Sequence, residues 1–389
     1  LAVHDGVVYY ATFEDQRLYR TDGDAEPTAI TPAPETEHGL RYADMEVSPD
    51  GERLYTVRER HEGEGAVDEP VTELVRLPTD GSDEPTVVAS GHDFYAAPKL
   101  SPDGEQLAWL GWDHPRMPWD GTELHLAPVA EDGAVGEDEV IMGGPEVSVF
   151  QPEWSPSGVL HAVADRTGWW NLYALGATGD AEPTNRTPEE AEFGVPQWAF
   201  GLSTYAFLDD GRVAVLRNSD GRSSLCLLDG TSRSEADLPF ESYPRAKLVS
   251  DGETLAFVAG GPATPPTVTR WEPEATAEEA GTSEVDRLRQ AFDLSLDEAA
   301  ISEPTHLDIP TRDDATTHAL YYPPCNPEVS EPEDESPPLV TMVHGGPTSQ
   351  TLPVATLAVQ FYTTRGFAVA DVNYRGSTGY GRAYRDALQ

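Results

Sequence analysis

"SPDGERLYTV" (residues 48–57) and "SPDGEQLAWL" (residues 101–110) are two copies of one short pattern. In each copy an Asp-Gly turn leads into a segment rich in apolar and aromatic residues. Asp-Gly adopts the left-handed backbone of a tight hairpin turn at little cost. The pattern therefore predicts an antiparallel hairpin at each copy.

An Asp-Gly turn, or a Ser-Gly turn at Gly158, recurs along most of the chain, with glycines at Gly6, Gly51, Gly104, Gly158, Gly211 and Gly252. Segments before and after each turn supply further short strands, although the first copy reads as lacking its leading strand. Four short antiparallel strands in every roughly 40–50 residues are typical of a β-propeller blade. A β-sandwich is the rival fold, but it does not repeat one hairpin six times. We expect a β-propeller over residues 1–275, incomplete at its N-terminus.

The pattern changes after an acidic segment, residues 276–303, which we interpret as a linker with some helical character. Residues 305–311 and 318–324 read as a strand pair. The apolar run 337–343 and the segment 367–373 read as buried strands, and residues 352–366 between them have helical spacing. Apolar strands that alternate with a helix indicate an α/β domain with a parallel sheet. We assign residues 304–389 to the N-terminal part of that domain.

The charge balance is strongly acidic, with 69 Asp and Glu against 25 Lys and Arg and a net charge of −44. Nucleic acids and anionic membranes recruit Lys and Arg, so we expect neither as a partner. Repulsion between carboxylates is screened at high ionic strength, which favours a protein adapted to high salt. The sequence has no apolar run long enough to predict a membrane span.

Two further features concern the cell compartment and the extent of the chain. Cys226 and Cys325 have no metal-site or redox spacing, which favours inert thiols in a reducing cytoplasm. We expect no cofactor. The N-terminus has no Met and no signal peptide, so the chain reads as a fragment.

The apolar run that ends at residue 343 is followed by His344, Gly345, Gly346 and Pro347. In an α/β-hydrolase, a loop at this place brings backbone N–H groups close to the reacting carbonyl oxygen, which requires glycine. Pro347 would stiffen the loop exit. The alternative is a plain Gly-Gly turn between a strand and a helix.

A second motif, "NYRGSTGYGR" (residues 373–382), begins where the next predicted strand ends. This pair of motifs resembles the prolyl oligopeptidase family of serine peptidases, most closely its acylaminoacyl-peptidase and dipeptidyl-aminopeptidase branch. The segments 112–124 and 165–173 are also similar to that branch. The resemblance implies a seven- or eight-bladed propeller that gates access to an α/β-hydrolase domain. It further implies cleavage of short peptides or of blocked N-terminal residues, with peptides as partners and a possible homo-oligomer.

The resemblance also implies roles for individual residues. Gly346, with Gly345, would donate backbone N–H groups to the oxyanion, and His344 would brace their loop. The floor beneath the site would be shaped by Asn373, Tyr374, Arg375 and Gly376. An internal salt bridge that holds the strand end is the alternative interpretation of Arg375.

No serine of the sequence has glycine both two positions before and two positions after it, so the Gly-x-Ser-x-Gly nucleophile turn is missing. The catalytic Ser, Asp and His are therefore expected outside these residues, and we expect this chain alone to be inactive. An esterase or amide hydrolase on the same scaffold remains an alternative for the complete protein. A propeller that binds ligands without catalysis is another.

The propeller sequence contributes its own candidates. His114, Arg116 and Trp119 lie in a loop rich in Trp and Pro and are candidates to face the substrate; a rigid loop between strands is the alternative. Asp113 and Asp120 flank them, but their spacing is not diagnostic of a metal site and we expect no metal. The Trp169-Trp170 pair reads as packing within a blade rather than as a ligand platform.

Overall fold

A computed structural model describes residues 1–61, 69–176, 182–273, 285–329 and 335–389, leaving aside the side chain of Asp313. The chain forms two compact units. Unit 1 contains Leu1–Ala164, Tyr173–Asn185 and Gln197–Gly201; unit 2 contains Asp165–Leu172, Arg186–Pro196 and Leu202–Gln389.

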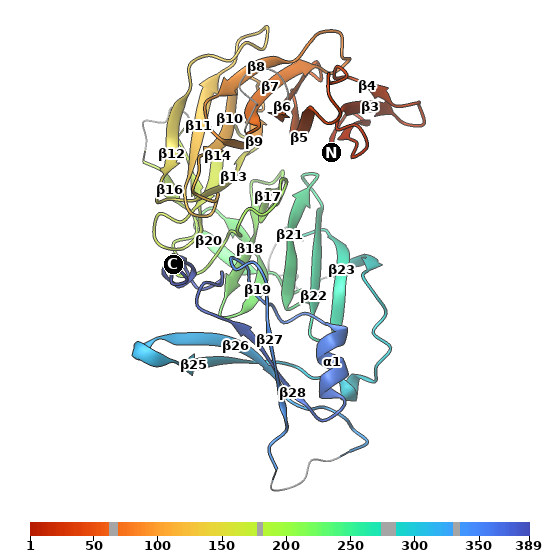
Figure 1. The fold of residues 1–389 in the computed structure, drawn as a ribbon, viewed down its shortest axis with the longest axis vertical. Helices are drawn as coiled ribbons and strands as arrows, with labels where there is room; N and C mark the ends of the chain where they lie inside the picture. Colours follow the sequence, from red (N-terminus) through yellow and green to blue (C-terminus); the bar gives the residue numbers. More distant parts are fainter. Residues whose placement is uncertain (62–68, 177–181, 274–284, 330–334) are drawn as a thin grey trace. The chain divides into compact units, whose positions relative to one another are not determined.

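The first three sheets of unit 1 are four-stranded, and the strands of each follow one another in chain order (Figure 1). The first sheet comprises β1 (Ala2–His4), β2 (Val7–Ala11), β3 (Leu18–Asp22) and β4 (Thr28–Ala29). The second sheet comprises β5 (Leu40–Val47), β6 (Arg53–Arg60), β7 (Val71–Pro78) and β8 (Thr86–Ser90). The third sheet comprises β9 (Phe94–Leu100), β10 (Gln106–Trp112), β11 (Thr122–Pro128) and β12 (Glu139–Gly144). A fourth sheet comprises β13 (Val149–Trp154), β14 (Leu160–Ala164), β15 (Asn171–Ala174) and β16 (Thr184–Asn185).

Unit 2 contains two more sheets of this kind. They comprise β17 (Tyr205–Phe207), β18 (Val213–Ser219), β19 (Arg222–Asp229) and β20 (Ser232–Glu235), then β21 (Ser242–Ser250), β22 (Leu255–Gly261), β23 (Thr264–Trp271) and β24 (Asp286–Gln290). The described residues thus form six four-stranded sheets of propeller-blade type, which confirms the predicted β-propeller.

The six repeated glycines lie between the first and second strands of the six sheets, with φ from +72° to +101°. These values fall in the region that glycine adopts without strain, so the hairpin interpretation is confirmed. The expectation that the first repeat lacks its leading strand is wrong. Ala2–His4 forms β1 and pairs with β2, Ala2 lying opposite Tyr9. Such a short strand is too brief to show a strand period in the sequence.

Buried side chains fill the spaces between neighbouring sheets. Leu54 and Tyr55 are adjacent on β6, yet Leu54 packs with residues of the first sheet and Tyr55 with residues of the third. Successive side chains on a strand point to opposite faces, so a blade between two others buries both faces. This double burial explains why the segments after the repeated turns are rich in apolar and aromatic residues.

The sixth sheet extends beyond residue 275, where we predicted the propeller to end. Its outer strand β24 lies within the expected linker, residues 276–303, and pairs with β23. All five residues of β24 are exposed, so the strand carries no hydrophobic pattern that would reveal it. The described linker also contains a 3₁₀ turn at Glu298–Ala300, capped by the Asp297 side chain; residues 274–284 lie outside the described residues.

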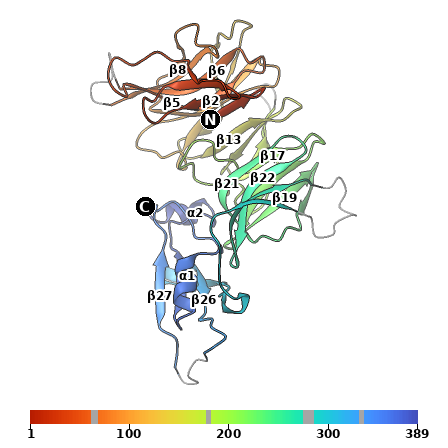
Figure 2. The same ribbon diagram turned by 90° about the vertical axis from the view of Figure 1, so that its right-hand side faces the viewer.

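The last sheet of unit 2 has the order β25-β26-β28-β27 and is the start of the α/β domain. β25 (Thr305–Pro310), β26 (Thr316–Tyr322) and β28 (Ala368–Asn373) are antiparallel neighbours, whereas β27 (Leu339–Val343) runs parallel to β28. Helix α1 (Leu357–Thr363) lies against one face, where Val359 joins a buried cluster with Leu320 and Val369 (Figure 2). The predicted strand pair, helix and parallel strands are confirmed.

β27 is less buried than its apolar sequence predicted. It forms the edge of the sheet, and Leu339 and Val343 are 57% and 65% exposed. An apolar run of this kind is typical of a strand that is covered on both faces. Within the described residues, β27 pairs with β28 alone.

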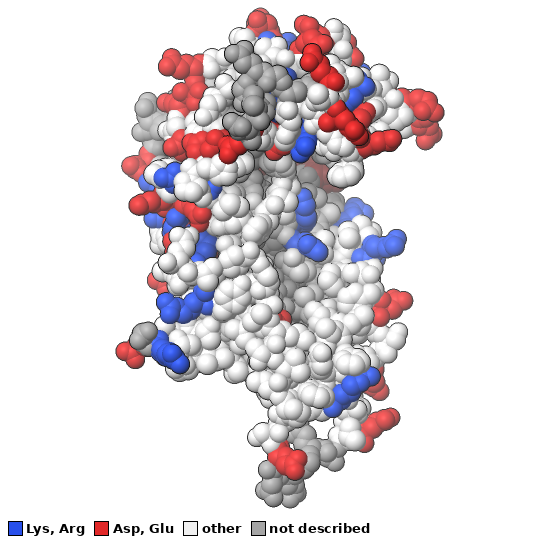
Figure 3. Space-filling model, viewed as in Figure 1, with Lys and Arg blue, Asp and Glu red and all other residues white. Residues whose placement is uncertain are grey.

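Carboxylates dominate the surface near the N-terminal sheets on the face drawn in Figure 3, whereas the part that holds β25–β28 carries few charges there. Among the described residues, no helix is long and apolar enough to cross a membrane.

A buried ionic cluster in unit 2 joins the loop after β14 to helix α2 (Arg382–Asp386). The Asp165 side chain is fully buried and accepts hydrogen bonds from Arg382 and Arg385, each at 2.7 Å. The Arg385 guanidinium lies over the Trp170 ring at 4.3 Å. Trp170 is buried, as the packing interpretation of this residue required.

Glu192 completes this junction. Its carboxylate accepts hydrogen bonds from the Trp170 N–H at 2.8 Å and the Gly381 N–H at 3.1 Å. Burial raises the pKa of Glu192 from 4.5 to about 7, although the two N–H groups and Arg385 oppose the shift. The folded chain therefore holds a proton on Glu192 more tightly than the unfolded chain does.

We predict that loss of the Glu192 proton lowers the free energy of unfolding as the pH rises from about 4.5 to about 7. Over this window the folded state binds more protons than the unfolded state, and the full shift corresponds to roughly 3 kcal/mol. Glu192→Gln removes the titration, so its stability relative to the wild type should increase across the window. Urea unfolding at several pH values measures this difference. The exposed Glu190→Gln is the matched control, and a Glu192→Gln difference that is flat from pH 4.5 to 7 would contradict the prediction.

Candidate functional site

The loop after β27 presents backbone groups to solvent. Gly345, Gly346 and Pro347 are exposed, and neither glycine N–H donates to an acceptor among the described residues. Gly346 has φ +141°, and a Cβ there would lie 3.0 Å from the Thr348 nitrogen. This position is therefore specific for glycine.

His344 is held on the inner side of this loop. Its Nε2 lies 2.8 Å from the Ser377 Oγ, and Ser377 is fully buried. The Tyr374 ring stacks on the imidazole with centroids 4.6 Å apart, and the Tyr374 hydroxyl donates to the His344 carbonyl at 3.2 Å. These contacts tie the glycine loop to the end of β28.

Asn373, the last residue of β28, makes a second tie. Its Oδ1 accepts from the Thr351 N–H at 2.7 Å, and its Nδ2 donates to the Thr351 carbonyl at 3.1 Å. The same Nδ2 lies 3.2 Å from the Tyr380 hydroxyl, whose pKa is raised by burial. Hydrogen bonds therefore connect the loop after β27 with the loop after β28 on both sides of the two glycines.

The remaining residues of the second motif differ in character. Gly376 has φ +119° and lies against Leu388, which a Cβ would approach to 2.9 Å. Arg375 is exposed and forms no ion pair with any carboxylate that the structure describes. Its two interpretations, as part of the site floor and as an internal salt bridge, stay predictions. Farther along the chain, Arg382 and Arg385 pair with the buried Asp165.

Unit 1 contains a separate pocket of about 350 Å³ whose walls are mostly aromatic and apolar. Trp119 is buried in its wall and its ring lies 4.3 Å from that of Trp198. His114 and Arg116 are exposed in the same loop but do not line the pocket. The lining residues are Val57, Glu59, Thr72, Phe94, Tyr95, Trp112, Met117, Pro118, Trp119, Gln197, Trp198, Ala199 and Phe200.

The structure thus brings His344–Pro347 and Asn373–Gly376 together in unit 2, and places His114, Arg116 and Trp119 in unit 1. Exposed N–H groups at Gly345 and Gly346 are suited to binding a negatively charged oxygen. The sequence did not identify Thr351 or Ser377 as residues that hold the glycine loop in place. Polar residues in loops give no signal of their own until the backbone brings their partners close.

Comparisons with known proteins agree with this arrangement. The model of the prolyl oligopeptidase family matches residues 354–389. The acylamino-acid-releasing enzyme of Rattus norvegicus is 41% identical over 69 residues, which are 18% of this chain and 9% of that protein.

Solved structures are similar over the whole chain. A puromycin-hydrolyzing peptidase of Mycobacterium tuberculosis is 38% identical, with a TM-score of 0.89 over 100% of this chain and 59% of that one. A puromycin hydrolase is 38% identical, with a TM-score of 0.87 over 99% of this chain and 59% of that one. Dipeptidyl peptidase 4 of Porphyromonas gingivalis shares the fold at 14% identity, with a TM-score of 0.66 over 98% of this chain and 57% of that one.

The chain spans 59% of the length of the two puromycin-cleaving relatives. The blades, the start of the α/β sheet and the two cross-linked loops all agree with these similarities. The chain is therefore similar to the prolyl oligopeptidase family of serine peptidases, through the family model over residues 354–389 and through the two puromycin-cleaving structures over its whole length.

Proposed function

We propose that the complete protein is a serine peptidase that hydrolyses short peptides or releases blocked or N-terminal residues. The observation that carries this proposal is the glycine loop, whose exposed N–H groups are held in place by Tyr374 and Asn373. The names of two relatives, an acylamino-acid-releasing enzyme and a puromycin hydrolase, support a substrate with an amide bond next to an amino-acid residue.

In the proposed reaction a serine attacks the substrate carbonyl, a histidine moves the proton and an aspartate orients that histidine. The Gly346 N–H, with that of Gly345, donates to the oxygen that becomes negatively charged, while His344 braces the loop and Asn373–Gly376 form the floor. None of these residues is the nucleophile, and no serine of the sequence lies in a Gly-x-Ser-x-Gly turn. We therefore propose that residues 1–389 alone are inactive.

The propeller would restrict access to small, unfolded peptides. The aromatic pocket of unit 1 is chemically suited to a large apolar side chain. Trp119 would contact such a side chain, and the exposed His114 and Arg116 are candidates for polar contacts with a peptide. A homo-oligomer is compatible with this function.

An esterase of the same fold is the principal alternative, and the substrate preference of the complete protein distinguishes the two. We predict that kcat/KM on aminoacyl or N-acyl-aminoacyl anilides exceeds kcat/KM on short acyl esters that carry no amino acid. The chain of residues 1–389 should hydrolyse neither and should not react with a fluorophosphonate probe. A preference for the simple esters would contradict the peptidase assignment. Labelling of a serine in residues 1–389 would contradict the inactivity of this chain.

The assignment of Gly346 is tested by two substitutions in the complete protein. Both Gly346→Ala and Gly346→Pro strain a backbone with φ +141°, but only proline removes the N–H. Loss of one oxyanion donor lowers kcat by about 10²–10³. We predict that kcat of Gly346→Pro is lower than that of Gly346→Ala by a factor in this range, with both variants folded by circular dichroism. Equal kcat values would show that strain, and not the N–H, causes the loss.

We also propose that the protein works in a cytoplasm of high salt concentration. The proposal is supported by a net charge of −44, a composition with Lys99 and Lys247 as the two lysines, and two free cysteines. At about 1 M salt the Debye length is about 3 Å, so repulsion between surface carboxylates is largely screened.

This proposal predicts that the melting temperature rises with salt concentration. Thermal unfolding in about 0.1 M and about 3 M KCl measures it, because the Debye length falls from about 10 Å to below about 3 Å between these concentrations. Sodium chloride in place of KCl controls for a specific effect of potassium. A melting temperature at low salt equal to or above that at high salt would contradict adaptation to salt.

A further inference from the structure

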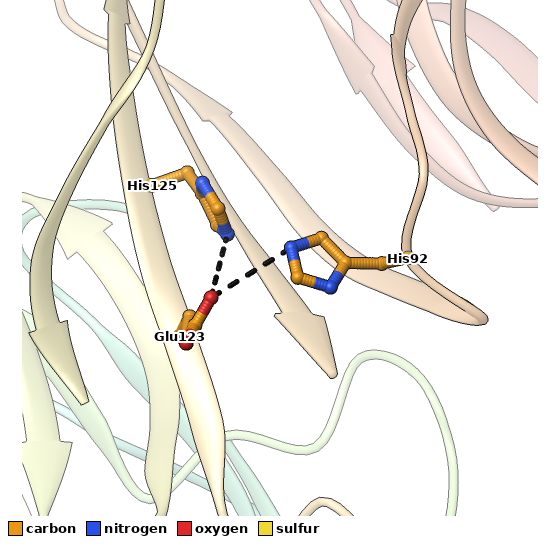
Figure 4. A group of neighbouring side chains, drawn as sticks. All are labelled: His92, Glu123 and His125. Atoms are coloured by element: carbon orange, nitrogen blue, oxygen red, sulfur yellow. Dashed lines mark ion pairs between the residues drawn. The ribbon is translucent and has the colours of Figure 1, made fainter. Parts of the chain in front are cut away.

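Three side chains of unit 1 direct their metal-binding atoms toward one point (Figure 4). Glu123 and His125 are two residues apart on β11 and share a face of the strand, and His92 lies in the turn between β8 and β9. The Glu123 Oε2 lies 3.8 Å from the Nε2 of His92 and 3.8 Å from the Nε2 of His125. One metal-binding atom of each residue lies within 4.8 Å of those of the other two.

Each imidazole is also held from its other side by a carboxylate. The Nδ1 of His92 lies 3.0 Å from Asp113 Oδ2, and the Nδ1 of His125 lies 2.7 Å from Asp138 Oδ2. A carboxylate at Nδ1 favours a proton there and leaves the lone pair of Nε2 toward the centre of the group. Histidines that bind metals in proteins almost always have such an outer partner.

The burial of His125 provides a second and independent indication. The residue is 6% exposed, its ring stacks on Trp109 at 5.5 Å, and its Nε2 has no hydrogen-bond partner among the described residues. A buried polar atom without a partner is costly, so this nitrogen is expected to meet a ligand. The Glu123 carboxylate lies beyond hydrogen-bond distance.

The His92 ring has space beside β11 because residue 111 is a glycine. Gly111 lies opposite Glu123 in the β10–β11 pair, and a Cβ at Gly111 would approach the His92 ring to 2.7 Å. Any larger residue there would displace His92 from the group. The His92 ring also makes an edge contact with the His125 ring at 5.1 Å, so the two imidazoles are fixed relative to each other.

We propose that His92, Glu123 and His125 bind a divalent transition-metal ion, with Zn²⁺ the best match. Two imidazole nitrogens and one carboxylate suit zinc, with bonds of about 2.0–2.2 Å, and a tetrahedral ion would bring the donor atoms to about 3.4 Å from one another. The 3.8 Å separations need small side-chain movements to reach that geometry. Water or a substrate group would take the remaining position, because the Glu123 side chain is 35% exposed.

The ion would order the loop that lines the aromatic pocket. Asp113, which holds His92, begins the segment that leads to Met117, Pro118 and Trp119 of the pocket wall. Asp93, next to His92, accepts a hydrogen bond from the His114 N–H at 2.9 Å. A metal fixed to His92 would therefore restrain both ends of this contact and the loop that follows.

The rival interpretation is a chain of ion pairs between protonated histidines and carboxylates in an acidic protein. The group formed by His306, Asp308 and His318 illustrates it. There the His306 Nε2 already lies 3.2 Å from the Tyr380 hydroxyl, and Asp308 is 68% exposed. We expect no specific metal binding at that second group, which makes it a matched control.

The test uses the complete protein, freed of metal by dialysis against a chelator, and calorimetric titration with Zn²⁺ at high salt. We predict one specific site. Asp138→Asn, which alters the outer partner of His125, should weaken binding by about 10–100-fold. The double variant His92→Gln and Glu123→Gln should abolish the site, whereas His318→Gln should leave it unchanged. Unaltered binding in the double variant, or no binding by the wild type, would overturn the proposal.

A second measurement guards against misfolded variants. Zn²⁺ should raise the melting temperature of the wild type and of His318→Gln, because a ligand of the native state stabilises it. Co²⁺ bound at the site should show the visible absorption of a site with nitrogen and oxygen ligands, and this absorption should be lost in the folded double variant. Equal melting shifts in the wild type and the double variant would show diffuse binding to surface carboxylates and contradict the site.

Discussion

The candidate site of unit 2 depends on the ion pairs that the buried Asp165 carboxylate makes. It accepts hydrogen bonds from Arg382 and Arg385 at 2.7 Å, and both belong to helix α2, which begins at the last residue of the second motif. Removing one partner of such a buried pair typically costs about 3–5 kcal/mol, since the other charge is left uncompensated. The cluster therefore fixes the position of Gly376–Tyr380, and Asn373 and Tyr374 transmit that position to the glycine loop. A segment encoded within the propeller thus supports the segment proposed to stabilise the oxyanion.

Much of the fold was predictable because its signals are local. An Asp-Gly or Ser-Gly turn needs a particular backbone conformation, and its repetition along the chain revealed six hairpins, all of which are formed. The strand Ala2–His4 was missed because so short a strand shows no period, and β24 was missed because all its residues are exposed. The exposure of β27 was not predictable either, since an apolar strand reads the same at an edge as at the centre of a sheet.

The candidate site was predictable in part, for a related reason. Glycines that serve as backbone donors leave a mark in the sequence, as His344-Gly345-Gly346-Pro347 does. Their supports, such as Thr351 and Ser377, are ordinary polar residues whose partners are far away in the sequence. The same applies to the proposed metal site, in which His92 precedes β9 while Glu123 lies on β11, so no short spacing joins them. Nor did the sequence single out Arg382 and Arg385, whose buried partner Asp165 lies far away along the chain.

The most direct test of this account is the coupling energy between Asp165 and Arg385. It is obtained from urea unfolding of the wild type, Asp165→Asn, Arg385→Gln and the double variant. Groups that share a buried network have coupling energies of about 0.5–3 kcal/mol, and we predict a value in the upper half of that range. A coupling near zero would mean that the two charges act independently, and it would contradict the view that this pair holds the second motif in place.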